Sequence, residues 1–97
     1  MVAGKYAATG KAMGKEMECH LDYQVDGNVL TGTMDIKGNK IEVMEGTVDG
    51  DNFKHKCQLA TPMGKMAVTI EGSVNGDEIS FILKNAFAKT QFTGHRE

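Results

Sequence analysis

The chain has 97 residues and a net charge of −2, which allows one domain with a single core. This mild charge gives no electrostatic support for binding to nucleic acid. Two cysteines do not make the disulfide framework of a small secreted domain, and no apolar run has signal-peptide length or the ~20 residues of a membrane span. We therefore expect a single cytoplasmic domain, residues 1–97, with no nucleic-acid or membrane partner.

Short apolar alternations fill the chain and are separated by two kinds of turn. The first kind contains lysine, near residues 14–15, 38–40 and 64–65; the second reads Asp26-Gly27, Asp49-Gly50 and Asn75-Gly76. Asp-Gly and Asn-Gly favour two-residue hairpins of type I′, in which both central residues have positive φ. Each kind recurs about once per hairpin length, which makes an internal repeat. The spacing predicts eight strands over residues 4–12, 15–25, 29–37, 40–48, 52–60, 65–74, 78–85 and 89–96.

Alternation with a period of two gives each expected strand one apolar face. The second strand shows it most clearly, with its apolar face formed by Met17, Cys19, Leu21, Tyr23 and Val25. The fourth strand breaks the alternation, because Ile41 and Val43 are out of phase with Gly46 and Val48. One extra residue restores the phase, so we expect a β-bulge near Met44-Glu45.

Eight consecutive antiparallel strands must bury their apolar faces and protect two sheet edges. Closure into a barrel does both. The inward glycines fit strands that coil tightly around a small barrel; they are Gly10, Gly32, Gly46, Gly72 and Gly94. The sequence therefore predicts an all-β, eight-stranded antiparallel up-and-down barrel, with a two-sheet sandwich of the same hairpins as the alternative.

The two ends of the chain carry a family resemblance. Gly4-Lys5-Tyr6 opens the first strand and Arg96 closes the last. This pattern resembles the calycin superfamily of lipocalins, fatty-acid-binding proteins and avidins, in which a basic residue of the final strand covers a Gly-x-Trp. The resemblance implies that Tyr6 replaces the Trp and that Arg96 stacks on its ring. Residues 72–96 also resemble small bacterial barrel domains.

Because the two kinds of turn alternate, the topology gathers carboxylates at one end of the barrel and lysines at the other. Apolar residues and a lysine rim at the lysine end suit a fatty acid, an aromatic acid or an acyl thioester. The candidate ligand-binding residues are Met13, Met17, Met34, Met63, Met66, Phe81, Phe87, Lys15, Lys40 and Lys65. The alternative is that these lysines are simply solvated beside their turns.

Polar residues on the inward faces are the candidates for chemistry. His55 is expected near Tyr6 and Tyr23, where a His/Tyr pair can transfer protons in an isomerase, cyclase or lyase. The competing interpretation is a core histidine that bonds to a tyrosine hydroxyl or a water. Cys19 and Cys57 are expected to be buried, inert thiols. No close-spaced Cys or His pair and no calcium loop occurs, so we expect no metal and no cofactor.

Three functions remain open at this level. A barrel of about eight strands is just wide enough to be filled by side chains or to hold one small ligand. The chain is therefore a binding module for a small hydrophobic or amphipathic anion, a proton-transfer enzyme, or an accessory subunit with a filled core. A protein partner or a homo-oligomer is compatible with each.

Overall fold

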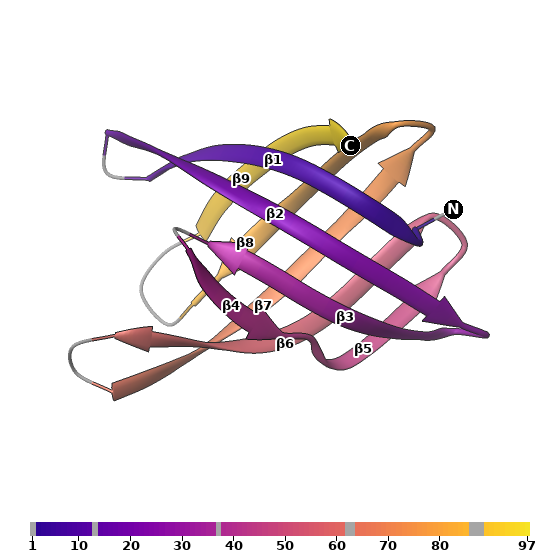
Figure 1. Cartoon of the computed structure of the whole chain (residues 1–97), viewed down its shortest axis with the longest axis horizontal. Coiled ribbons are helices and arrows are strands. Elements are labelled where there is room, and N and C mark those ends of the chain that lie inside the picture. The colour runs from indigo at the N-terminus through magenta and orange to yellow at the C-terminus, as the bar shows by residue number, and fades with distance from the viewer. Residues whose placement is uncertain (1, 13, 37, 62–63, 86–88) are drawn as a thin grey trace.

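The computed structural model describes residues 2–12, 14–36, 38–61, 64–85 and 89–97, and these form strands and turns without a helix (Figure 1). Accordingly, no helix in these ranges is long and apolar enough to cross a membrane. The strands are β1 (Gly4–Ala12), β2 (Lys15–Asp26), β3 (Val29–Ile36), β4 (Asn39–Glu42), β5 (Met44–Asp49), β6 (Asn52–Thr61), β7 (Gly64–Asn75), β8 (Glu78–Lys84) and β9 (Lys89–Arg96).

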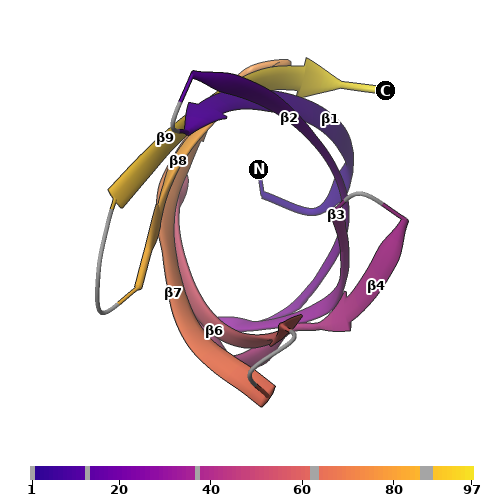
Figure 2. The same ribbon diagram turned by 90° about the vertical axis from the view of Figure 1, so that its left-hand side faces the viewer.

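The strands form one closed antiparallel barrel. Successive strands pair in chain order, and β1 pairs with both β2 and β9, which joins the two ends of the sheet (Figure 2). β4 and β5 are two parts of one strand interrupted at Val43, so the barrel has eight strands. The predicted up-and-down barrel is confirmed, and the sandwich alternative is wrong because β1 and β9 close the sheet.

The interruption between β4 and β5 is the predicted bulge. Ile41 and Gly46 are both buried although five positions separate them, and the pairing register with β6 shifts between Met44 and Thr47. Glu45 has a φ of 49°, which gives the local kink. The extra residue returns the apolar residues of β5 to the inside, as the broken alternation predicted.

The polar hairpins differ from the prediction in their turn type. Pairing of Asp26 with Val29, and of Asn75 with Glu78, makes Gly27-Asn28 and Gly76-Asp77 the two central residues. Gly27 and Gly76 have φ of 65° and 62°, whereas the residues that follow them do not have positive φ. Glycine at the first central position is the type II′ arrangement. The type I′ prediction is wrong, because shifting the turn by one residue lets glycine alone take the left-handed conformation.

Inward glycines let neighbouring strands approach closely, as predicted. A Cβ on Gly94 would collide with the Ala7 carbonyl oxygen, and one on Gly72 with the Ser80 carbonyl oxygen. The side chains beside these glycines fill the space, and the rings of Phe81 and Phe92 stack at 4.9 Å. The small radius of the barrel therefore depends on these glycines as well as on the packed side chains beside them.

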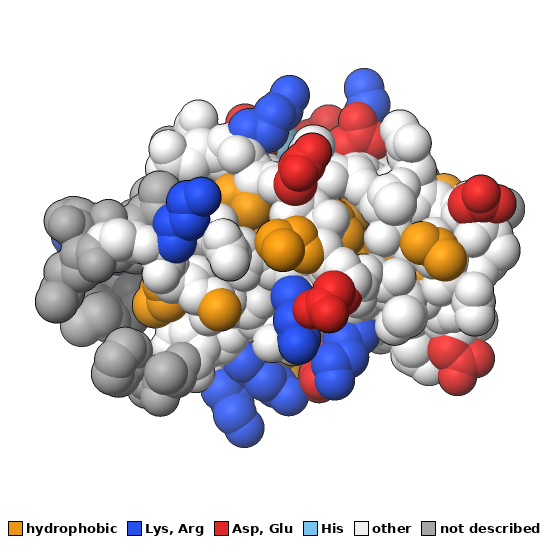
Figure 3. Space-filling view, turned by 90° about the horizontal axis from the view of Figure 1, so that it is seen from below, with side chains coloured by type: hydrophobic (Ala, Val, Ile, Leu, Met, Phe, Trp, Pro, Cys, Tyr) orange, Lys and Arg blue, Asp and Glu red, His pale blue; other side chains and the backbone are white. Residues whose placement is uncertain are grey.

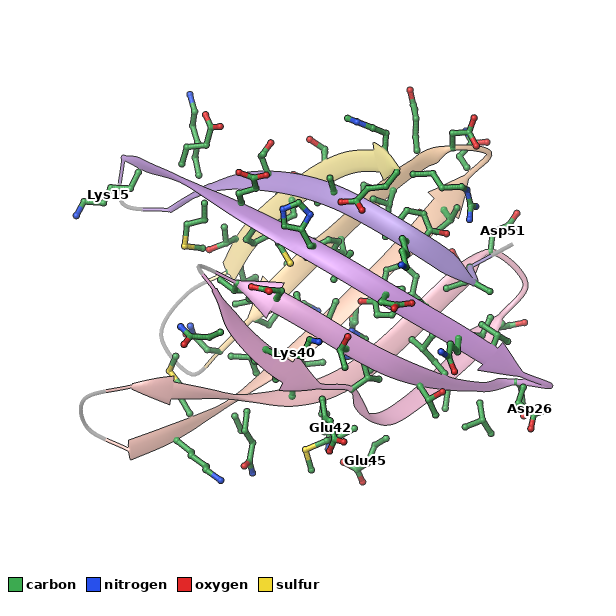
Figure 4. The ribbon with its side chains drawn as sticks, in the orientation of Figure 1. Lys15, Asp26, Lys40, Glu42, Glu45 and Asp51 are labelled. Atoms are coloured by element: carbon green, nitrogen blue, oxygen red, sulfur yellow. The ribbon has the colours of Figure 1, made fainter. Side chains whose placement is uncertain are left out.

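The turns at the two ends differ in charge, as the topology predicted, although lysines and carboxylates face each other along the strands, as in the pairs Lys11–Glu16 and Lys5–Asp22. Lys15 lies at one end and Asp26 and Asp51 lie at the other, whereas Lys40 lies between them on β4 (Figure 4). In the view from below, acidic side chains mark the right-hand end, and small apolar patches lie between lysines and carboxylates (Figure 3). The two ends of the barrel, a lysine end and an acidic end, therefore differ in the charge of their turns.

Candidate functional site

The acidic end of the barrel is closed by the N-terminal residues, which lie inside the ring of strands (Figure 2). Val2 is only 1% exposed, and its carbonyl oxygen accepts a 2.6 Å hydrogen bond from the Tyr6 hydroxyl. Arg96 donates from Nη1 to the Ala3 carbonyl oxygen at 2.7 Å, and its guanidinium lies 4.8 Å from the centre of the Tyr6 ring. The stacking of Arg96 on Tyr6, implied by the family resemblance, is confirmed.

Arg96 also ties this closure to the neighbouring β7–β8 turn. Its Nη2 donates to the Gly76 carbonyl oxygen at 3.1 Å, and its Nε lies 3.5 Å from Asp77 Oδ1. Burial raises the pKa of Tyr6, against the opposing effect of the Arg96 charge. The phenol therefore stays protonated and keeps its hydrogen bond to Val2.

Tyr23 and His55 meet inside the barrel, next to the closed end. The Tyr23 hydroxyl lies 2.6 Å from His55 Nε2, and both residues are buried. The Phe53 ring lies against both, 5.3 Å from Tyr23 and 6.4 Å from His55 between ring centres. The predicted proximity of Tyr23 and His55 is confirmed, and the contact matches that of a core histidine bonded to a tyrosine hydroxyl.

Electrostatics keeps this pair neutral. Burial lowers the pKa of His55 to about 4 and raises the pKa of Tyr23 well above its ordinary value. The neutral imidazole accepts a hydrogen bond from the Tyr23 hydroxyl at Nε2, which places its own proton on Nδ1, 3.4 Å from the Lys56 carbonyl oxygen. The pair is therefore built as a phenol donor and an imidazole acceptor.

The two thiols are buried and free, as predicted. Burial raises the pKa of Cys19 to about 12 and that of Cys57 to about 11, so both are protonated at neutral pH. A protonated thiol is a poor nucleophile and a poor metal ligand. Across the described residues, no group of three His, Cys, Asp or Glu side chains is arranged to hold a metal ion.

Some of the predicted apolar ligand-binding residues belong to the packed core, and others are half-buried near the lysine end. Met34 is fully buried, and Phe81 stacks on Phe92, so both belong to the packed core. Met17 and Met66 are half-buried and pack against the core from the lysine end. Met13, Met63 and Phe87 lie outside the described residues.

The predicted lysines are all exposed, and two of them share a groove. Lys40 and Lys65 line a groove of about 530 Å³ between β4 and the β6–β7 hairpin, together with Ile41, Met44 and Gln58. Lys15 lies at the lysine end on β2, and no described residue of the groove belongs to β2. The structure therefore brings Lys40 and Lys65 together and leaves Lys15 apart.

Two residues of the interior were not predicted. Val2 precedes the first expected strand, and nothing in its neighbourhood indicated that it would close the barrel. Thr90 is 8% exposed and is a buried polar residue near the lysine end. The alternation through Phe92 and Gly94 was sufficient to place Thr90 inside, because the three share one face of β9.

Comparison with known proteins adds no relative. The chain matches no protein-family model, no curated protein and no solved structure. The fold alone defines its class, a small closed antiparallel barrel that is compatible with a calycin-like architecture.

Proposed function

We propose that this barrel binds a small hydrophobic ligand with an anionic end, of the class of fatty acids, aromatic acids or acyl thioesters. One observation carries the proposal: the two ends of the barrel differ. Val2 and Arg96 close one end, whereas toward the other end Lys40 and Lys65 line a groove where β4 and β6 do not pair. Membership of the calycin superfamily and a cytoplasmic location belong to the same proposal.

The chemistry of the lysine end suits such a ligand. Exposed ammonium groups raise the local concentration of anions. Met17 and Met66, just inside, have flexible thioether side chains that repack around apolar chains of different shapes. The ligand's apolar part is directed inward and its charged group stays beside Lys15, Lys40 and Lys65, where water and ammonium groups solvate it.

Decanoate and its neutral analogue 1-decanol test this proposal by calorimetry or by displacement of a fluorescent anionic dye. The variant Lys15→Glu/Lys65→Glu should weaken decanoate binding about tenfold or more and leave decanol binding unchanged, because only the acid interacts with the rim charge. Lys5→Glu, at the acidic end, is the matched control. Absence of saturable decanoate binding, or an equal effect on acid and alcohol, contradicts the proposal.

A proton-transfer enzyme is the second candidate, and the 2.6 Å contact between Tyr23 and His55 supports it. In this case a ligand captured with the native protein, identified by intact mass spectrometry, is also a substrate. Turnover by the wild type and loss of turnover in His55→Gln would favour the enzyme over the binding module. A protein that carries and binds no small molecule would point instead to an accessory subunit with a filled core.

A further inference from the structure

One edge of β4 has no pairing partner among the described strands. β4 pairs with β3, from Ile36 opposite Asn39 to Thr33 opposite Glu42. The Val43 N–H continues this ladder and donates to the Gly32 carbonyl oxygen at 3.0 Å. Hydrogen bonding alternates along an antiparallel strand, so the backbone groups of Lys40 and Glu42 point away from β3.

The next strand of the barrel does not pair with this edge. β5 pairs with β6 as far as Met44 opposite Lys56, and the described pairing of β6 beyond Lys56 is with β7 alone. The pairing with β6 therefore ends at the bulge, and the groove lies between β4 and β6. An exposed edge of this kind is a template for another strand.

We propose that β4 pairs antiparallel with β4 of a second copy of this chain, centred on Ile41. In this register Lys40 lies opposite Glu42 of the second copy, and Glu42 lies opposite its Lys40. Both residues point their backbone groups at the free edge, so each such pair exchanges its two N–H···O bonds. The contact obeys two-fold symmetry, and the same residues serve on both sides.

The side chains of β4 support the same register. Lys40 and Glu42 are exposed on the outer face, and Figure 4 shows them along β4. Pairing about Ile41 places each ammonium beside a carboxylate across the two strands, and opposite charges in directly opposed positions stabilise a sheet. Met44, which is 43% exposed, follows directly after Val43 and adds apolar surface next to the contact. The four residues of β4 are therefore complementary in charge to a copy of themselves.

Sedimentation velocity over a range of protein concentrations, without added ligand, tests this contact by charge reversal. The wild type should dimerise, and Lys40→Glu or Glu42→Lys alone should weaken the dimer at least tenfold, because like charges then oppose each other. An equimolar mixture of the two variants should form a heterodimer, and the double variant Lys40→Glu/Glu42→Lys should recover the homodimer. High salt should weaken the wild-type dimer.

Two controls separate pairing from folding. Lys40 also lies opposite Asp35 on β3, whereas Glu42 lies opposite Thr33, so Glu42→Lys tests the contact without a second acidic neighbour. Thermal unfolding of each variant confirms that it is folded, and Lys5→Glu should dimerise like the wild type. A wild type that stays monomeric at millimolar concentration overturns the proposal, as do single variants that dimerise normally or a mixture that fails to associate. Because no ligand is present, none of these outcomes depends on the proposed binding function.

Discussion

At the scale of single residues, the hydrogen bond between Tyr23 and His55 links β2 to β6 across the barrel interior. A buried donor or acceptor that loses its partner costs about 1–3 kcal/mol, so two polar side chains are tolerated here only as a pair. Their rings also pack against Phe53, which excludes water from the contact. The pair is therefore sensitive to any change that adds a charge.

His55 should make the stability of the protein fall in mild acid. The unfolded chain takes up a proton near the ordinary histidine pKa of 6.5, whereas the folded chain does so only near a pKa of about 4. Between these values the unfolded state binds more protons than the folded state. The free energy of unfolding therefore decreases as the pH is lowered, by about 3 kcal/mol in all. Chemical denaturation of the wild type and of His55→Gln from pH 7 to pH 4 measures this loss.

Comparing the wild type with His55→Gln cancels the pH dependence of stability that comes from all other titratable groups. His20 has the opposite sign, because Glu97 and then Glu18 raise its pKa, so its contribution grows as the pH falls. His55→Gln should lose clearly less stability than the wild type over this range. Parallel curves for the two proteins would show that His55 does not keep its lowered pKa.

At the scale of the strand, small inward residues let neighbouring strands approach, and the bulge decides where pairing ends. Gly94 leaves room for the Ala7 carbonyl oxygen on β1. The bulge at Glu45 restores the inward phase of β5, but the pairing with β6 also ends there, so β4 does not pair with β6. One extra residue therefore both preserves the core and exposes the edge of β4.

Gly94→Ala should destabilise the barrel by about 1–3 kcal/mol or more, because the new methyl group meets backbone that cannot move without breaking the β1–β9 pairing. Thr93→Ala, on the exposed face of the same strand, is the matched control and should change stability little. Denaturant midpoints of the three proteins give the comparison. Equal midpoints for Gly94→Ala and the wild type would mean that β1 and β9 have room to separate.

At the scale of the whole molecule, the barrel has one closed end and one lysine-rich end. Arg96 holds the closed end together through contacts between distant parts of the chain, because it contacts the N-terminal residues, the Tyr6 ring and the β7–β8 turn. The free edge of β4 and the groove belong to the other end. Both proposals, ligand binding and self-association, therefore concern the lysine side of the barrel.

Arg96→Gln should destabilise the protein by about 2 kcal/mol, because the charge-assisted hydrogen bond to Ala3 and the contact with the Tyr6 ring are both lost. Amide hydrogen exchange should speed up in the first strand near Tyr6 more than in β7 near Val68. Lys84→Gln, which removes a partly exposed ion pair with Glu71, is the control and should have a smaller effect. Unchanged exchange near Tyr6 would show that Arg96 does not hold the closure.

The sequence by itself determined the strands, their inward faces, the bulge and the closed barrel, because alternation and hairpin turns are local signals that each strand carries alone. It also determined that Tyr23 and His55 would lie near each other, since depth can be counted along paired strands. Only the tertiary structure decided that Val2 closes one end, that the polar turns are type II′, and that β4 does not pair with β6. These features depend on how strands far apart in the sequence approach each other in a curved sheet, and the curvature of the sheet cannot be predicted from a short stretch of sequence.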